Sequence, residues 1–136
     1  MVRETSKPLD PHPELTIITG SILSPETVLE TLQQCTHIFI TVGNRSIRRE
    51  TDICSKGQQI FNEAIMKLPR GQIKKVIMVS GAGAGESISE IPFIIRLFAK
   101  LFAKQIYLDK GIQEDLIKKL GQEYGCEWTV SKYILW

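Results

Sequence analysis

Short apolar runs alternate with amphipathic segments along this chain. Four runs rich in β-branched residues are too short for globular helices, and they predict β-strands at 15–19, 37–42, 73–80 and 128–131. Between and after them, apolar residues recur at helical spacing and predict helices over 24–34, 53–68, 91–107 and 109–124. Strands that alternate with helices in this way are typical of an α/β fold with a doubly wound parallel sheet.

The predicted helices carry recognisable start signals. Ser24 before Pro25 offers a hydroxyl to the open backbone N–H groups, and proline at the first helical position loses no hydrogen bond. Asp109 is predicted to cap the last helix in the same way. The inner face of that helix is expected to carry Ile112, Leu116, Ile117 and Leu120.

The segment 91–107 combines many apolar residues with Arg96, Lys100 and Lys104 at four-residue intervals. A basic amphipathic helix of this kind can bind a membrane surface. Its length and setting favour a different interpretation, a helix packed on the body with a solvated stripe of cations. A membrane partner is therefore not expected.

The glycines after the third run suggest a dinucleotide phosphate loop, but the pattern is incomplete. Gly81 and Gly83 match the first two glycines of G-x-G-x-x-G, whereas the third position is Glu86. A carboxylate there would repel a pyrophosphate. We interpret 81–85 as a small-residue turn that lets a ligand or another backbone approach closely.

Composition narrows the class of protein. A chain of 136 residues is long enough for one domain with a buried core. A formal charge of +2, with basic and acidic residues interleaved, does not indicate a nucleic-acid partner. Three cysteines without C-x-x-C spacing predict neither a disulfide framework nor a metal site. With no apolar leader in 1–7, we expect a cytoplasmic protein.

Several short motifs, taken in order, resemble a known family. They are Val2-Arg3, 15–20, 37–43, 76–81, Asp109-Lys110 with Glu114, and Trp128-Thr129-Val130. Together they resemble atypical short-chain dehydrogenase/reductases, in particular the NmrA-like and biliverdin/flavin-reductase-like NAD(P)H-binding domains. The resemblance implies one Rossmann-like NAD(P)-binding domain over 1–136. It also implies truncation at both ends, because the family's first strand and glycine-rich turn should precede Val2.

The resemblance implies contacts to the adenosine half of the cofactor. Arg3 stands where family members hold the 2′-phosphate of NADP, so NADP is slightly favoured over NAD. Gly20 and Ser21 occupy the place of a Gly-Asp pair that lies along the adenine. Val42, Gly43 and Asn44 match the segment that passes under the adenosine.

The resemblance also implies contacts to the nicotinamide half. Ser80, Gly81 and Ala82 match the strand end beside the nicotinamide, where the Ser80 hydroxyl can bond the cofactor or substrate. Lys110 matches a lysine that reaches the nicotinamide ribose. Tyr107 is one residue too close to Lys110 for a Tyr-x-x-x-Lys pair, so no catalytic residue is assigned.

Two functions remain open at this point. The first is an NAD(P)H-dependent oxidoreductase, or a remnant of one, with a small-molecule substrate that the residues do not identify. The second is a non-catalytic nucleotide-sensing or interaction protein on the same fold. The missing phosphate turn and Ser21 favour the non-catalytic protein. The strand-end motifs, which follow one another in the order found in the family, favour the oxidoreductase.

Overall fold

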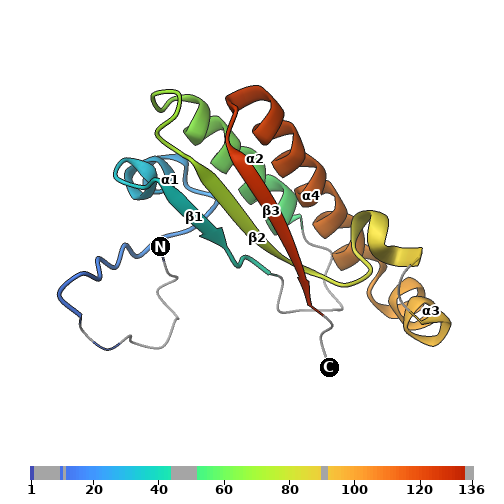
Figure 1. Ribbon diagram of the computed structural model, residues 1–136. Coiled ribbons are helices and arrows are strands. Elements are labelled where there is room, and N and C mark those ends of the chain that lie inside the picture. Colours follow the sequence, from blue (N-terminus) through green and yellow to red (C-terminus); the bar gives the residue numbers. More distant parts are fainter. Residues whose placement is uncertain (2–9, 11, 44–51, 90–91, 134–136) are drawn as a thin grey trace.

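A computed structural model describes residues 1, 10, 12–43, 52–89 and 92–133 of the chain (Figure 1). Its helices are α1 (Pro25–Leu32), α2 (Ile53–Met66), α3 (Phe93–Phe102) and α4 (Lys104–Tyr124), with a short 3₁₀ helix η1 (Gly85–Ser89). Its strands are β1 (His37–Ile40), β2 (Lys75–Gly81) and β3 (Glu127–Tyr133).

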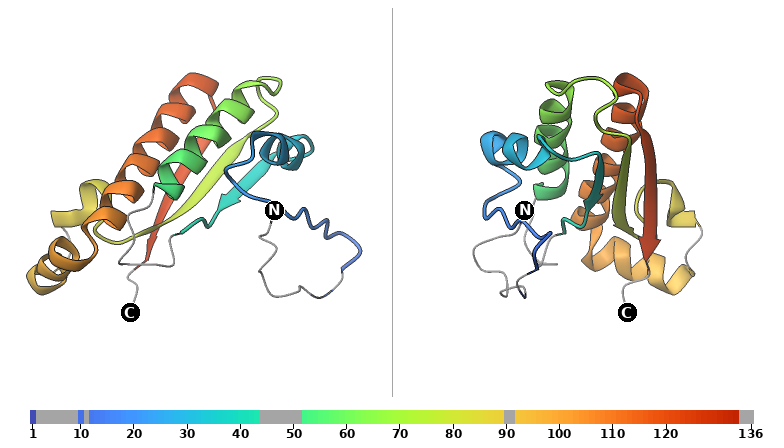
Figure 2. Two further views of the ribbon diagram at one scale, coloured as in Figure 1. Left: turned by 180° about the vertical axis from the view of Figure 1, so that it is seen from behind. Right: turned by 60° about the vertical axis from the view of Figure 1, so that its left-hand side comes forward.

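The three strands form one parallel sheet in the order β1-β2-β3. In one row across the sheet, Ile38 pairs with Val76, and Val76 with Trp128. Helices α2 and α4 lie side by side across one face, as the views from the front and from behind show (Figures 1 and 2). Their connections give the βαβ arrangement expected for a parallel sheet, because parallel neighbours need a crossover.

The core lies between this sheet face and the two helices. On the strands, alternate residues point into it, so β2 buries Val76, Met78 and Ser80. Ile65 of α2 and Ile117 of α4 meet them there and are fully buried. The opposite face of the sheet carries the row Phe39, Ile77 and Thr129, in which Phe39 is 70% exposed.

The predicted strand over 15–19 does not form. Only Thr19 makes an isolated bridge, and Leu15 and Ile17 are exposed. A strand is stabilised by a ladder to a neighbour, and apolar alternation alone does not provide that neighbour. The described part of the chain therefore has three strands, not four.

The predicted helix over 91–107 is also wrong in its bounds and its packing. α3 ends at Phe102, Ala103 departs from helical geometry, and α4 begins at Lys104. Asp109 consequently lies inside α4 and does not cap it. Contrary to the expected packed helix, Phe93 and Ile94 of α3 are 67% and 79% exposed.

Two smaller expectations fail for local reasons. Ser24 precedes α1, but its hydroxyl contacts the side chains of Glu26 and Thr27, and no side-chain cap forms. On α4, Ile112 is 52% exposed, whereas Ile117 and Leu120 are buried as expected.

Candidate functional site

The carboxyl ends of the three strands lie along one edge of the sheet. Val42 and Gly43 follow β1, Gly81 ends β2, and Gly81 pairs with Tyr133 at the end of β3. In an open α/β sheet, ligands bind at this edge. The edge is also where the buried polar side chains of α4 gather.

Lys110 of α4 ties the ends of β1 and β2 together. Its Nζ donates to the carbonyl oxygens of Val42 at 2.5 Å and Val79 at 3.3 Å, and to Oε1 of Gln113 at 3.0 Å. Three acceptors match the three N–H bonds of an ammonium group. Burial lowers the pKa of Lys110, and the nearby Cys54, Asp109 and Glu114 oppose that shift.

Glu114 lies one turn further along α4 and ties β2 to β3. Its Oε1 accepts a hydrogen bond from the Ser80 hydroxyl at 2.6 Å, and its Oε2 is 3.2 Å from Nζ of Lys132. Glu114 and Ser80 are 2% and 3% exposed. A buried carboxylate requires such partners, because desolvation of an unpaired charge is costly.

The turn after β2 is shaped by the same carboxylate. Lys132 also donates to the carbonyl of Ala84 at 3.0 Å, which joins β3 to the turn. Gly85 has a φ of 55°, and a Cβ there would come within 2.5 Å of Glu114 Oε2. Glycine is therefore required at Gly85, both for the left-handed backbone and for the close approach of Glu114.

The glycine turn itself is not a phosphate cradle. Ala82 N–H donates to the Tyr133 carbonyl at 2.8 Å, Gly83 N–H to the Ser87 hydroxyl at 3.0 Å, and Ala84 N–H to the Gly81 carbonyl at 3.1 Å. A phosphate loop needs backbone N–H groups that point at the ligand. The structure thus agrees with the sequence argument against a dinucleotide loop here.

Asp109 caps a helix other than its own. Its two carboxylate oxygens accept the backbone N–H groups of Cys54 at 3.0 Å and Ser55 at 2.9 Å, in the first turn of α2. Asp109 is only 6% exposed, and its carboxylate lies at the positive end of the α2 dipole. Asp52 occupies the N-cap position of α2 but makes no side-chain cap bond.

A buried amide chain continues from Lys110 into the space between α2 and α4. Gln113 donates to Gln58, Gln58 donates to Asn62, and Asn62 donates to the Leu116 carbonyl, at 3.3, 2.9 and 2.8 Å. Gln58 and Gln113 are fully buried. Sequence reasoning missed these three amide residues, although polar residues at inward positions of a helix are a signal of such a network. It named Glu114 only as part of a motif and did not identify its partners.

Gly20 and Ser21, which were predicted to lie along the adenine, are found beside α1. Gly20 packs against Thr27, where a Cβ would come within 2.5 Å of its Cγ2. Ser21 closes the turn before α1, with its hydroxyl accepting the Leu23 N–H at 3.2 Å. Gly57 of α2 receives the side chain of Ile22, which accounts for a glycine within that helix.

The other predicted residues fall into three cases. Gly43 and Gly81 leave space beside them, because a Cβ added at either would meet no atom of the described residues within 4 Å. Arg3 and Asn44 lie outside the described residues. The Ser80 hydroxyl points under α4 toward Glu114, so the structure does not direct it to the open edge.

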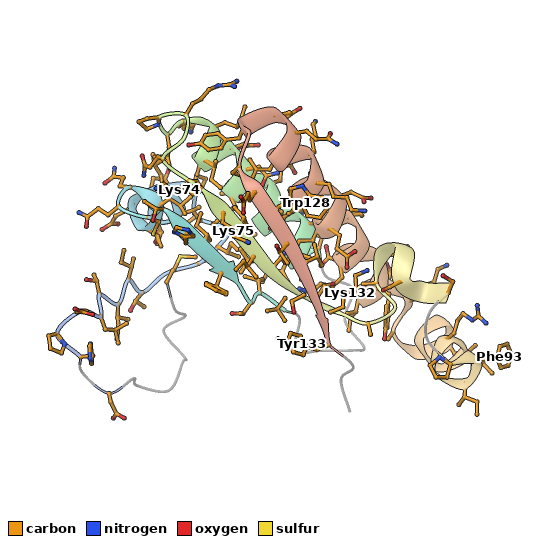
Figure 3. All side chains as sticks on the ribbon, in the orientation of Figure 1. Lys74, Lys75, Phe93, Trp128, Lys132 and Tyr133 are labelled. Carbon is orange, nitrogen blue, oxygen red and sulfur yellow. The ribbon has the colours of Figure 1, made fainter. Side chains whose placement is uncertain are left out.

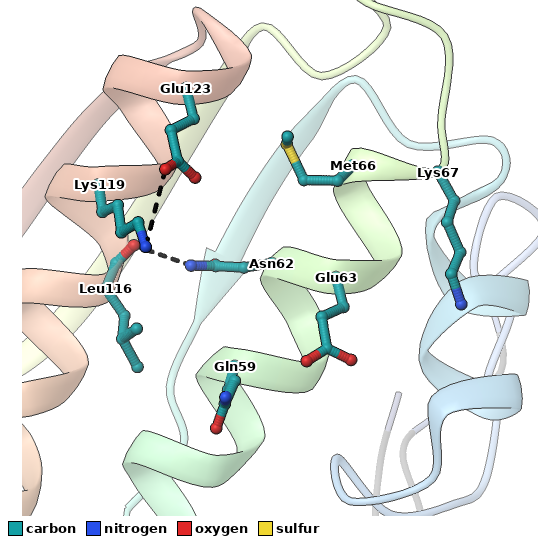
Figure 4. Close-up of a pocket in the computed structure, with 8 residues that line it drawn as sticks. All are labelled: Gln59, Asn62, Glu63, Met66, Lys67, Leu116, Lys119 and Glu123. Carbon is teal, nitrogen blue, oxygen red and sulfur yellow. Dashed lines mark hydrogen bonds and ion pairs between the residues drawn. The ribbon is translucent and has the colours of Figure 1, made fainter.

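A groove of about 500 Å³ lies elsewhere, between the outer surfaces of α2 and α4 (Figure 4). Its lining includes Glu63 and Met66 of α2 and Lys119 and Glu123 of α4. Nζ of Lys119 is 3.7 Å from Oε1 of Glu123. These residues belong to the halves of the helices remote from Lys110. Within the described ranges, no three His, Cys, Asp or Glu side chains gather in a way that could hold a metal ion.

Comparisons with known proteins agree with this architecture. A family described as NAD(P)H-binding matches residues 1–131. The fold is similar to that of ChuY, described as an anaerobillin reductase from Escherichia coli O157:H7, with a TM-score of 0.57 at 15% identity. That match covers 82% of this chain and 47% of ChuY, so the chain spans about half the length of that protein. No curated protein matches the chain in sequence.

Proposed function

Because the chain belongs to the NAD(P)H-binding family, we propose that the carboxyl edge of its Rossmann-like sheet holds the nicotinamide nucleotide, at Val42-Gly43 and at Gly81-Ala82. The observation that carries this proposal is the open space at Gly43 and Gly81. Packing against the residues that the structure describes does not require glycine at either position. A cofactor that lies across the strand ends would require it, since a side chain would fill the space.

The residues fit the two nucleoside halves of the cofactor better than its pyrophosphate. The backbone N–H groups of the turn after β2 are engaged within the protein, as described above. At the strand ends, in contrast, Gly43 and Gly81 carry no side chain, so a nucleoside could approach the backbone there. We assign the adenosine half to Gly20, Ser21 and the 42–44 segment, and the nicotinamide half to the 80–82 segment.

Lys110 and Glu114 are positioning residues in this proposal. Lys110 fixes the ends of β1 and β2, and Glu114 fixes β2, β3 and the turn at Ala84. Their contacts to these elements leave the shape of the edge little freedom. Such preorganisation is what precise placement of a cofactor needs.

A nicotinamide nucleotide supplies hydride chemistry, and on this basis we propose an NAD(P)H-dependent oxidoreductase activity. ChuY, a reductase by its description, shares the fold and supports the same class of reaction. Arg3 favours NADP, because a guanidinium group pairs two N–H donors with the 2′-phosphate. A cytoplasmic location suits a protein that depends on this cofactor.

Titration of the purified chain with NADPH, followed by nicotinamide fluorescence, tests the proposal. Gly43→Leu is expected to weaken binding at least tenfold while the chain still folds, because the new side chain has open space to occupy. Glu63→Leu, in the remote groove of Figure 4, is the matched control and is expected to bind like the wild type. Equal affinity for Gly43→Leu and wild type would refute this placement.

The preference for NADP is tested separately. Arg3→Ala is expected to weaken NADPH binding by roughly tenfold and to leave NADH binding unchanged, because only NADPH carries the 2′-phosphate. An equal effect on both nucleotides would remove the assignment of Arg3.

A second function, nucleotide sensing without catalysis, is favoured by one observation. The ammonium group of Lys110 already has an acceptor for each of its N–H bonds and does not need the ribose. Incubation with NADPH and a panel of flavins, quinones and aldehydes separates the two functions. NADPH binding without any consumption of NADPH would support the sensor.

A further inference from the structure

Helix α3 carries an apolar face that the rest of the described chain leaves exposed. Phe93, Ile94, Leu97 and Leu101 are 67%, 79%, 45% and 65% exposed. With 3.6 residues per turn, these four residues fall within an arc of about 100° on the helix. Figure 3 shows Phe93 at the outer end of α3, directed away from the sheet. We call these four residues the α3 stripe.

The charged residues of α3 and of the start of α4 have one sign. From Phe93 to Leu108 the sequence contains Arg96, Lys100 and Lys104 and no aspartate or glutamate. Arg96 and Lys104 are exposed, and the Arg96 guanidinium carbon is 5.8 Å from the centroid of the Phe93 ring. A cation therefore lies at the border of the apolar stripe, as a complement to a negatively charged surface.

We propose that α3 binds the surface of a bilayer that contains anionic lipids. An apolar stripe flanked by Arg and Lys suits the boundary between headgroups and acyl chains, where the stripe enters the hydrocarbon and the cations meet the lipid charges. The 10 residues of α3 span about 15 Å, which suits a helix lying in the interface plane. None of the described helices is long and apolar enough to cross a membrane.

The position of α3 supports this contact. It lies at one end of the molecule, beyond the carboxyl end of the sheet, in both the front view and the view from behind (Figures 1 and 2). A flat surface can therefore reach the stripe without meeting α1 or β1. This run of positive charge favours a lipid surface as the partner. An apolar groove on a protein would bind the stripe without requiring cations beside it.

Co-sedimentation of the full chain with vesicles tests the proposal. At low ionic strength, the chain is expected to sediment with phosphatidylcholine vesicles that contain phosphatidylserine, and at least tenfold less with pure phosphatidylcholine. Ile94→Ser/Leu101→Ser is expected to weaken sedimentation at least tenfold, because two exposed apolar side chains are lost. A Phe93→Trp variant is expected to shift its fluorescence to the blue on vesicles.

Phe39→Ser is the matched control, since Phe39 is 70% exposed but lies on the sheet, away from α3. It is expected to sediment like the wild type. Failure of the wild type to sediment with either vesicle would overturn the proposal, as would binding that survives Ile94→Ser/Leu101→Ser. The proposal is also overturned if the stripe is buried between two copies, which light scattering would show as a dimer that the double variant dissociates.

Discussion

The contribution of Glu114 to the carboxyl edge of the sheet can be tested through its hydrogen bond to Ser80. The donor and acceptor are 2.6 Å apart, and the two residues are 3% and 2% exposed. A hydrogen bond to a charged group contributes about 1.5–3 kcal/mol, so Ser80→Ala is expected to lower the free energy of unfolding by about 2 kcal/mol. In urea, this appears as a lower midpoint at an unchanged slope.

A double-mutant cycle separates the charge from the hydrogen bond. Glu114→Gln keeps an acceptor for Ser80 but removes the charge, and a neutral hydrogen bond contributes only about 1 kcal/mol. Ser80→Ala is therefore expected to cost about 1 kcal/mol in the Glu114→Gln background. Ser131→Ala is the control, because Ser131 is half-buried on the opposite face of the neighbouring strand and should change stability by less than about 0.5 kcal/mol. If Ser80→Ala costs no more than Ser131→Ala, Glu114 does not hold the edge as argued.

Two further predictions concern α2 and α4. Asp109→Ala is expected to lower the free energy of unfolding in urea by about 2 kcal/mol, because it removes both cap bonds of α2. Asp52→Ala loses only an exposed ion pair to Lys56 and is expected to lower it by less than about 0.5 kcal/mol. A larger loss for Asp52→Ala than for Asp109→Ala would contradict the assignment of Asp109 as the cap. Gly121→Ala is expected to lower the melting temperature, because its Cβ would clash with the indole of Trp128. In a Trp128→Leu background the same change is expected to raise the melting temperature, since the gain in helix propensity of about 1 kcal/mol remains. A lower melting temperature in both backgrounds would show that the indole is not the obstacle.

The sheet was predictable because its strands are encoded locally. The predicted strands at 37–42, 73–80 and 128–131 correspond to β1, β2 and β3 within a few residues, since each is a short β-branched run. The run at 15–19 has the same local pattern and forms only an isolated bridge at Thr19. Local pattern predicts a tendency to extend, whereas a strand also requires a neighbour, which depends on the whole chain.

The break at Ala103 was not predictable for a similar reason. Neither proline nor glycine marks it, and apolar residues continue through it at helical spacing. Asp109 was expected to cap a helix, and it does so, but the helix is α2 and not the last helix. Sequence spacing does not reveal that Asp109 caps α2, where the N–H group of Cys54 that it accepts lies 55 residues earlier in the chain.

The candidate site was predicted as a set of strand ends, and its supporting polar groups were not. Val42, Gly81 and Lys110 do meet at one edge. Glu114 and Lys132 were missed as partners, because their pairing joins α4 to β3 and depends on the register of the sheet. Their assigned roles toward a cofactor stay predictions until binding is measured.

Helix α4 does not follow the simple rule that the buried face of a helix is apolar, and this is why its buried residues were only partly predicted. Its first half buries the polar residues Asp109, Gln113 and Glu114, while its second half buries Ile117 and Leu120. A helix that served only the core would bury apolar residues along its whole length. The polar half instead holds α2, β2 and β3 in place at the edge where the strands end. Departures from the simplest packing rule tend to occur where a protein shapes a site, and here they coincide with the carboxyl edge of the sheet.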